Sequence, residues 1–320
     1  MDRCFRSQRL REVGLIHLSL KTGVGWSCGS FGELVQGYTY DGKVLITLPV
    51  DVYSRAVFYP QVGVPLNVIP TEKTKALQLA ISLLQDLGFS HLGGTITIEC
   101  DIPEGKGLSS SSADLVAVAR ALESSLNIEA DVARLAAIMA KVEPSDGIMY
   151  DGIVSFHPVR GQLKRHLGPV PKLVIVALDE GGTVDTVKFN QLPHRMDLHH
   201  TTDFSRLLER AERAVQANDV WGMGQAATQS AMENQKLLPK RYLELFLKLR
   251  SKYSLPGVVV AHSGTYIGML LDPLDVRCRQ QLDRLKEELE TTLGRVPEVF
   301  HTTSVASKLV TFTDRSLPER

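Results

Sequence analysis

Residues 103–113, with the sequence PEGKGLSSSSA, constrain the fold of this chain more than any other segment. Just before them, residues 95–100 alternate polar and apolar side chains, which predicts a half-buried strand. Just after them, apolar side chains recur at the spacing of one helical face, at Leu115, Val116, Ala119 and Leu122. That spacing predicts an amphipathic helix. The glycines and serines therefore fall in a strand-to-helix turn and in the first turn of the helix.

Such a helix start has the chemistry of an anion site. Its first N–H groups have no partner within the helix, and the helix dipole places positive charge there. Gly105 and Gly107 allow the backbone to approach a ligand closely, and the serines add hydroxyl donors. Nucleotide phosphates are the anions we expect. An ordinary helix cap uses the same residue types, and on these grounds alone it stays open as an alternative.

Two common nucleotide-binding motifs are missing from the sequence. The phosphate loop G-x-x-x-x-G-K-[ST] does not occur, because Val44 and Gly107 follow the two Gly-Lys pairs. The dinucleotide motif G-x-G-x-x-G fails at residues 105–110, because Ser110 stands at its third glycine. Any nucleotide must therefore be bound by another kind of loop.

Composition and charge favour a small-molecule enzyme. The 320 residues are 43% apolar and 22% charged, with 36 basic and 36 acidic side chains. This balance gives no argument for nucleic acid or a membrane surface, and no apolar run approaches the roughly 20 residues that span a bilayer. The four cysteines form no C-x-x-C pair, which favours reduced thiols and a cytoplasmic location.

Two further segments place carboxylates among small residues. Residues 25–37 contain Glu33 and Gln36; by themselves they predict a turn entering a strand, with Glu33 exposed. After a helix that Pro144 ends, residues 145–152 contain Asp146 and Asp151. Asp and Gly are common in turns, but phosphoryl transfer also needs a carboxylate to orient or deprotonate an acceptor hydroxyl. Both interpretations stay open from the residues alone.

The remaining pattern alternates strands and helices. Strands are expected at 44–50, 52–59, 153–156, 173–178, 298–300 and 309–312, with a hairpin at 256–271 and turns at 158–171. Helices are expected at 73–87, 130–140, 204–215, 221–232, 241–249 and 275–293. This order predicts an α+β fold.

The glycine-serine loop resembles the ATP loop of the GHMP kinases, the superfamily of galactokinase, homoserine kinase and mevalonate kinase. That loop runs approximately P-x-x-x-G-L-[GSA]-S-S-[AST], and residues 103–112 match it in register. The resemblance implies that ATP and Mg²⁺ are the cofactors and that Ser111 contacts the metal. The ATP-binding residues would be Pro103, Glu104, Gly105, Lys106, Gly107, Leu108, Ser109, Ser110, Ser111 and Ser112.

Other segments are similar to the L-threonine kinase branch of that superfamily. They are S-x-G-E-L-x-Q-G at 30–37, an acidic glycine-rich segment at 179–186, and H-S-G-T-x-x-G at 262–268. The resemblance makes Glu33, Gln36 and Asp185 candidates for binding the substrate. It makes Asp146 the candidate catalytic base, with Asp151 as the fallback. Since some members do without a catalytic carboxylate, that option also stays open.

The resemblance implies a two-domain fold, with a left-handed βαβ unit in the N-terminal domain and a ferredoxin-like C-terminal domain. We expect an extension at 1–22, without a signal-peptide core, an ATP-binding domain at 23–180 and a second domain at 181–320. The implied activity is phosphorylation of the L-threonine side chain to O-phospho-L-threonine, for the aminopropanol linker of cobalamin. A kinase of serine, homoserine or another small alcohol, and a non-catalytic nucleotide-binding regulator, are the alternatives. The expected partner is an amino-acid substrate, without nucleic acid or membrane, and a homodimer is left open.

Overall fold

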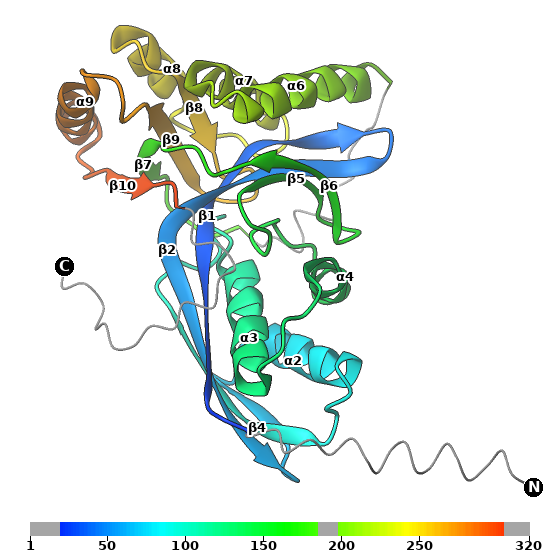
Figure 1. Cartoon of the computed structure of the whole chain (residues 1–320). Coiled ribbons are helices and arrows are strands. Elements are labelled where there is room, and N and C mark those ends of the chain that lie inside the picture. The colour runs from blue at the N-terminus through cyan, green and yellow to red at the C-terminus, as the bar shows by residue number, and fades with distance from the viewer. Residues whose placement is uncertain (1–19, 185–197, 304–320) are drawn as a thin grey trace, which may run out of the picture.

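The computed structural model describes residues 20–184 and 198–303, which form two β-sheets with helices packed on them (Figure 1). The first sheet has the strand order β3-β4-β2-β5-β6, and β1 pairs with β2. Its strands are β1 (Gly23–Thr39), β2 (Gly42–Val62), β3 (Leu66–Ile69), β4 (Leu92–Cys100), β5 (Ile153–His157) and β6 (Gln162–Gly168).

The hairpin of β1 and β2 is the longest feature of the first sheet, and it reaches from the lower end of the molecule to the helix α6 (Figure 1). Residues 44–50 and 52–59 belong to the single strand β2, so the prediction of two adjacent strands was wrong. The register shifts between Cys28 and Gly29, whose partners are Tyr53 and Val50. The extra residues on β2 form a bulge, which bends the strand without ending it.

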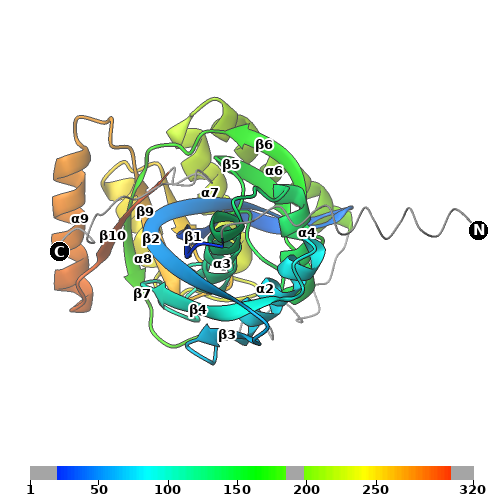
Figure 2. The ribbon, with the colours of Figure 1, turned by 60° about the horizontal axis from the view of Figure 1, so that its bottom comes forward.

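Three helices cover one face of the first sheet: α2 (Thr74–Asp86), α3 (Ser110–Leu126) and α4 (Val132–Val142). Figure 2 shows β2 and β4 curving around α3, most of whose residues are buried. Gly25 lets β1 lie directly against this helix, because a Cβ there would stand 2.1 Å from the backbone oxygen of Ala117. The parallel strands β3 and β4, joined through α2, form a βαβ unit.

The second sheet is antiparallel, in the order β10-β7-β9-β8. Its strands are β7 (Val174–Asp179), β8 (Gly257–Val260), β9 (Tyr266–Leu271) and β10 (Glu298–His301). The helices of this half are α6 (Leu198–Gln216), α7 (Val220–Asn234), α8 (Leu243–Lys252) and α9 (Cys278–Leu293). Two sheets with packed helices confirm the predicted α+β fold. Although β7 pairs within this second sheet, the domain boundary at 180 stays a prediction.

An aromatic cluster joins the two halves. Phe31 on β1 lies edge-on to Tyr266 on β9 and to Phe300 on β10, with ring centroids 5.9 Å and 5.4 Å away. All three side chains belong to the larger hydrophobic core, which continues from the first sheet into the second. Burial of such large rings, with edge-to-face contacts between them, fixes the two sheets relative to each other.

The strand β6 was not predicted, because residues 158–171 were expected to form turns. Five of its seven residues are exposed, and they are mostly polar, so no apolar alternation marks the strand. The expected strand at 309–312 and residues 1–19 of the expected extension lie outside the described residues. Among the described helices, none has the length and apolarity needed to cross a membrane.

Candidate active site

The loop before α3 is shaped by three residues with left-handed backbone conformations. The φ angles are 69° at Gly105, 80° at Gly107 and 63° at Ser109. A Cβ on Gly107 would lie 2.7 Å from the Cβ of Ala261 and from the Cα of Gly264, so only glycine fits there. The loop is therefore packed directly on the turn between β8 and β9.

The start of α3 lines a cavity. Ser110, Ser111 and Ser112 form the first turn, and no side chain of the described residues caps it. The first N–H groups of an uncapped helix are free to bind an anion, which the helix dipole also favours. The helix start therefore has the features of a phosphate site.

This cavity has a volume of about 640 Å³ and brings together most of the predicted site residues. Lys106 does not line it; its Nζ instead donates to Asp179 Oδ2 at 2.6 Å and to the Gly182 oxygen at 2.7 Å. Asp151 is exposed and does not line the cavity either, and Asp185 lies outside the described residues. The predicted residues along the wall are Glu33, Gln36, Pro103, Glu104, Gly105, Gly107, Leu108, Ser109, Ser110, Ser111, Ser112 and Asp146.

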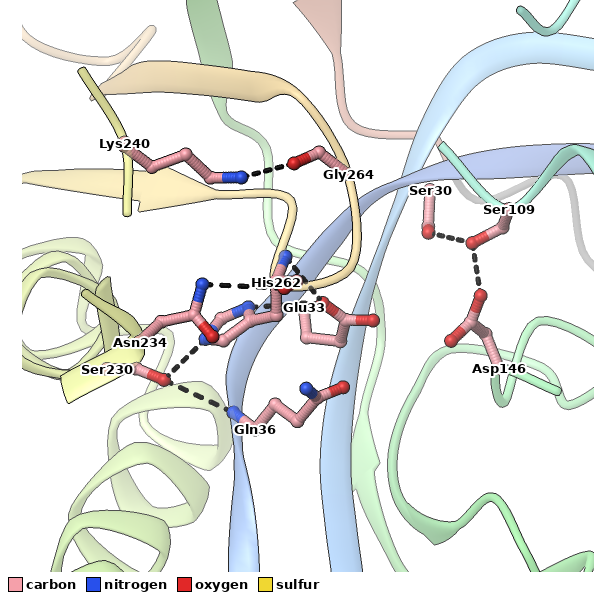
Figure 3. Close-up of polar contacts among 10 residues, drawn as sticks. All are labelled: Ser30, Glu33, Gln36, Ser109, Asp146, Ser230, Asn234, Lys240, His262 and Gly264. Atoms are coloured by element: carbon pink, nitrogen blue, oxygen red, sulfur yellow. Dashed lines mark hydrogen bonds and ion pairs between the residues drawn. The ribbon is translucent and has the colours of Figure 1, made fainter. Parts of the chain in front are cut away.

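Asp146 stands at the end of a short chain of hydroxyl groups (Figure 3). Ser109 Oγ donates a hydrogen bond to Asp146 Oδ2, and Ser30 Oγ bonds to Ser109 Oγ. Removal of Asp146 from water, together with the negative charge of Glu33, raises the pKa of its carboxyl to about 7. A carboxylate with this pKa can both accept and hold a proton near neutral pH, as a general base requires.

Glu33 is buried, with 4% of its surface exposed, so the prediction from residues alone that it is exposed was wrong. Its Oε2 accepts hydrogen bonds from the backbone N–H of His262 at 3.3 Å and from His262 Nδ1 at 3.1 Å. Burial raises the pKa of Glu33, but the bonds and charge of His262 outweigh it and lower the pKa. Glu33 is therefore a fixed negative charge in the cavity wall.

The partners of Glu33 come from the second half of the chain (Figure 3). The other ring nitrogen of His262, Nε2, lies 2.8 Å from Ser230 Oγ on α7, and Ser230 Oγ accepts from the backbone N–H of Gln36 at 3.2 Å. Lys240 Nζ donates to the backbone oxygen of Gly264, and burial lowers the pKa of Lys240 to about 8. These bonds hold the β8–β9 turn against β1 and against the loop.

Ser111 and Glu143 lie together on another wall of the cavity. Ser111 Oγ donates to Glu143 Oε1, and Lys75 pairs with Glu143 Oε2. The described residues contain no group of three or more His, Cys, Asp or Glu side chains that could hold a metal. Mg²⁺ is commonly bound by one or two protein oxygens and the phosphates of its nucleotide, so this pair fits Mg²⁺ without a full protein cage.

Sequence reasoning missed Lys43, Lys73 and Glu143 as members of the site, and it named His262 only as part of the H-S-G-T-x-x-G segment, without a committed role. Lys43 on β2 lies near Glu33 and Asp146; burial lowers its pKa, and the two acids oppose that effect. Lys73 bridges Glu104 at 2.5 Å and Asp114 at 2.7 Å beside the loop. No local motif marks the lysines, because the register of β2 and the packing of α2 bring them to the cavity.

Comparisons with known proteins point to one family. The family model of the GHMP kinases N terminal domain matches residues 74–153, which include the loop and α3. A homoserine kinase from Cytophaga hutchinsonii has a similar structure, with a TM-score of 0.68, 15% sequence identity, and coverage of 89% of this chain and 96% of that one. The fold and the loop thus define the class, which is that of the GHMP kinases.

Sequence relatives narrow the class. An L-threonine kinase from Citrobacter freundii is 30% identical over 261 residues, or 80% of this chain and 88% of that protein. One from Salmonella typhimurium is 29% identical over 265 residues, or 81% of this chain and 85% of that protein. This chain therefore belongs to the L-threonine kinase branch of the GHMP kinases. It is an ATP-dependent kinase whose acceptor is an alcohol group.

Proposed function

We propose that this kinase phosphorylates the side-chain hydroxyl of L-threonine to give O-phospho-L-threonine. The observation that carries this proposal is the cavity with an uncapped helix start on one side and Glu33 and Asp146 on the other. Glu33 offers a buried negative charge for the ammonium group of an amino acid. Use of the product for the aminopropanol linker of cobalamin is part of the proposal and rests on the family resemblance.

The loop residues would bind the triphosphate through backbone N–H groups and the positive end of α3. Ser111 and Glu143 would hold Mg²⁺, which when bound neutralises charge on the phosphates. Asp146 would orient the threonine hydroxyl and take its proton. The oxygen then forms a bond to the γ-phosphorus, the bond between that phosphorus and the β–γ bridging oxygen breaks, and ADP leaves.

The pKa of Asp146 supports its role as the base. At about 7 it leaves a substantial fraction of carboxylate in a neutral solution, and the protonated form is also accessible. The charge of Lys43 lowers the pKa of both Asp146 and Glu33, so it offsets the repulsion between the two acids. Asp151 is exposed and does not line the cavity, which favours Asp146 over Asp151 as the base.

The experiment that tests the proposal measures ADP release with ATP and Mg²⁺ across L-threonine, L-serine, L-homoserine, mevalonate and a control without acceptor. We expect L-threonine to give the highest kcat/KM, with L-serine lower by about 10–200-fold, the range that one missing methyl group produces. The product is identified by ³¹P NMR against authentic O-phospho-L-threonine.

Other outcomes separate the alternatives. Higher turnover of L-homoserine or mevalonate would rule out L-threonine as the substrate and would still support kinase activity. ATP binding without turnover of any acceptor would contradict the proposal and favour a regulator. The methyl ester of L-threonine and N-acetyl-L-threonine add a test of Glu33, because N-acetylation removes the ammonium group and the ester does not. We expect N-acetylation to abolish turnover.

A further inference from the structure

Ser109 has a backbone conformation that glycine adopts more easily. Its φ and ψ are 63° and 30°, in the left-handed region. A side chain in this region costs free energy because the Cβ approaches the backbone, and glycine avoids the cost. The presence of serine here therefore points to a use for its hydroxyl group.

The direction of the hydrogen bonds around this hydroxyl is fixed by proton counting. Ser109 Oγ donates to Asp146 Oδ2, and a hydroxyl has one proton to donate. The bond between Ser30 and Ser109 must then have Ser30 as its donor whenever Asp146 is ionised. Ser30 is itself fully buried on β1, and its backbone N–H donates to the Leu108 oxygen at 3.1 Å. The strand β1 thus fixes the position of the Ser30 hydroxyl. Ser30 donates to Ser109, and Ser109 donates to the carboxylate of Asp146.

We propose that Ser109 is a positioning residue for Asp146, and that Ser30 orients it. By occupying Oδ2, Ser109 leaves Oδ1 as the oxygen that meets the acceptor hydroxyl. The backbone N–H groups of Asp146 and Gly147 donate to Ser112 Oγ at 3.3 Å and to Thr47 Oγ1 at 3.1 Å. These two bonds hold the backbone around Asp146, while Ser109 holds the carboxylate itself. The catalytic part of this inference rests on the proposed function.

The charges around Asp146 define what loss of the Ser109 hydroxyl would do. Glu33 on β1 and Glu143 after α4 raise the pKa of Asp146, in addition to its burial. Lys43 on β2 and the hydrogen bond from Ser109 lower it. Without the hydroxyl, the proton-bound form of Asp146 is favoured. The pKa of Asp146 should therefore rise above its value of about 7.

Two variants separate the hydroxyl from the backbone strain. Ser109→Gly removes the hydroxyl and the strained side chain, so we expect a Tm equal to or above that of the wild type. Ser109→Ala removes the hydroxyl but keeps a Cβ at positive φ, so its Tm should fall below that of Ser109→Gly. Both variants should raise the pKa of Asp146 and lower kcat for L-threonine about 10–150-fold, the size expected for a hydrogen bond to a charged group.

The first measurement does not require a substrate. Aspartate carboxyl groups labelled with ¹³C are titrated by NMR in the wild type and both variants, and Asp146→Asn identifies the Asp146 resonance. A higher pKa in both variants supports the inference, and an unchanged pKa overturns it. A purely structural role of Ser109 would alter Tm without moving this titration.

The second measurement is the pH dependence of kcat with L-threonine. The acidic limb of the profile should move to higher pH in both variants, together with the NMR titration. If the wild type fails to phosphorylate L-threonine, the proposed function fails while the titration still decides the role of Ser109. If the wild type turns over L-threonine and neither variant changes kcat or the limb, the positioning role is wrong and the proposed function stands.

Discussion

At the scale of single residues, two acids in one cavity have opposite pKa shifts. His262 and its bonds lower the pKa of Glu33, whereas burial and the charge of Glu33 raise that of Asp146. When the environment shifts the pKa values of two neighbouring acids in opposite directions, one commonly acts as a fixed charge and the other as a proton acceptor. The same division suits the proposed function, in which the site must bind an ammonium group and accept a hydroxyl proton.

Asp146→Asn should lower kcat at least 100-fold, because removal of a general base typically costs that much. In the wild type, kcat/KM should fall as the pH drops through about 7, because the ionised carboxylate is the active form. A pH–rate series on both proteins checks this. A variant with near wild-type kcat would indicate transfer without a carboxylate base.

The same substitution should change stability in a pH-dependent way. The pKa of Asp146 is about 7 in the folded chain, above its ordinary value of 3.8, so the folded state binds more protons between these values. The contribution of Asp146 to stability is therefore present at low pH and lost as the pH rises toward 7. We expect Asp146→Asn to have a higher Tm than the wild type at pH 8, with a smaller difference at pH 5. Thermal unfolding at both pH values measures it.

Glu33→Gln should raise the KM for L-threonine about tenfold or more, because the ammonium group loses a charged partner. The KM for ATP should stay unchanged. Since Glu33 raises the pKa of Asp146, its neutralisation should also move the acidic limb of the pH profile to lower pH. Steady-state kinetics across pH test both effects, and a limb that stays in place would contradict the coupling between the two acids.

At the scale of elements, the local sequence pattern predicted most individual helices and strands but not the contacts between them. The loop and α3 followed from the glycines, the serines and the helical spacing after them. The polar strand β6 lacked apolar alternation, and the bulge near Asp51 made β2 look like two strands. The contact of Glu33 with His262 joins residues 229 positions apart, so no local pattern contains it.

Gly107→Ala tests how the loop is held. The new Cβ would stand 2.7 Å from Ala261 Cβ at a φ of 80°, so the loop must move away from the β8–β9 turn. We expect the KM for ATP to rise at least tenfold and the protein to lose about 1–3 kcal/mol of stability.

The matched control for this variant is Gly63→Ala. Gly63 has a similar φ of 77°, but nothing lies within 4 Å of an added Cβ. It should therefore lose stability through backbone strain alone and keep its KM for ATP. Equal effects of the two variants on ATP would mean that contact with the β8–β9 turn does not shape the loop.

At the scale of the whole molecule, the site is built where the two halves meet. The first sheet supplies Glu33 and Lys43, and the second supplies the turn that binds Glu33 and supports Gly107. The aromatic cluster of Phe31, Tyr266 and Phe300 holds the same junction. A ligand bound in the cavity therefore lies where the first half of the chain meets the β8–β9 turn of the second.

Binding of ATP with Mg²⁺ should accordingly stabilise the whole chain. At 100 times the Kd, a ligand that binds only the folded state adds about 2.7 kcal/mol of stability, which raises Tm.

Because Ser111 and Glu143 are the oxygen pair that fits Mg²⁺, Ser111→Ala and Glu143→Gln should lose the part of this rise in Tm that depends on Mg²⁺. Thermal unfolding with ATP, in Mg²⁺ or in EDTA, measures that part. Glu288→Gln is the control, since Glu288 pairs with Lys252 away from the cavity, and it should keep the full Mg²⁺-dependent rise. A full Mg²⁺-dependent rise in both Ser111→Ala and Glu143→Gln would place the metal elsewhere.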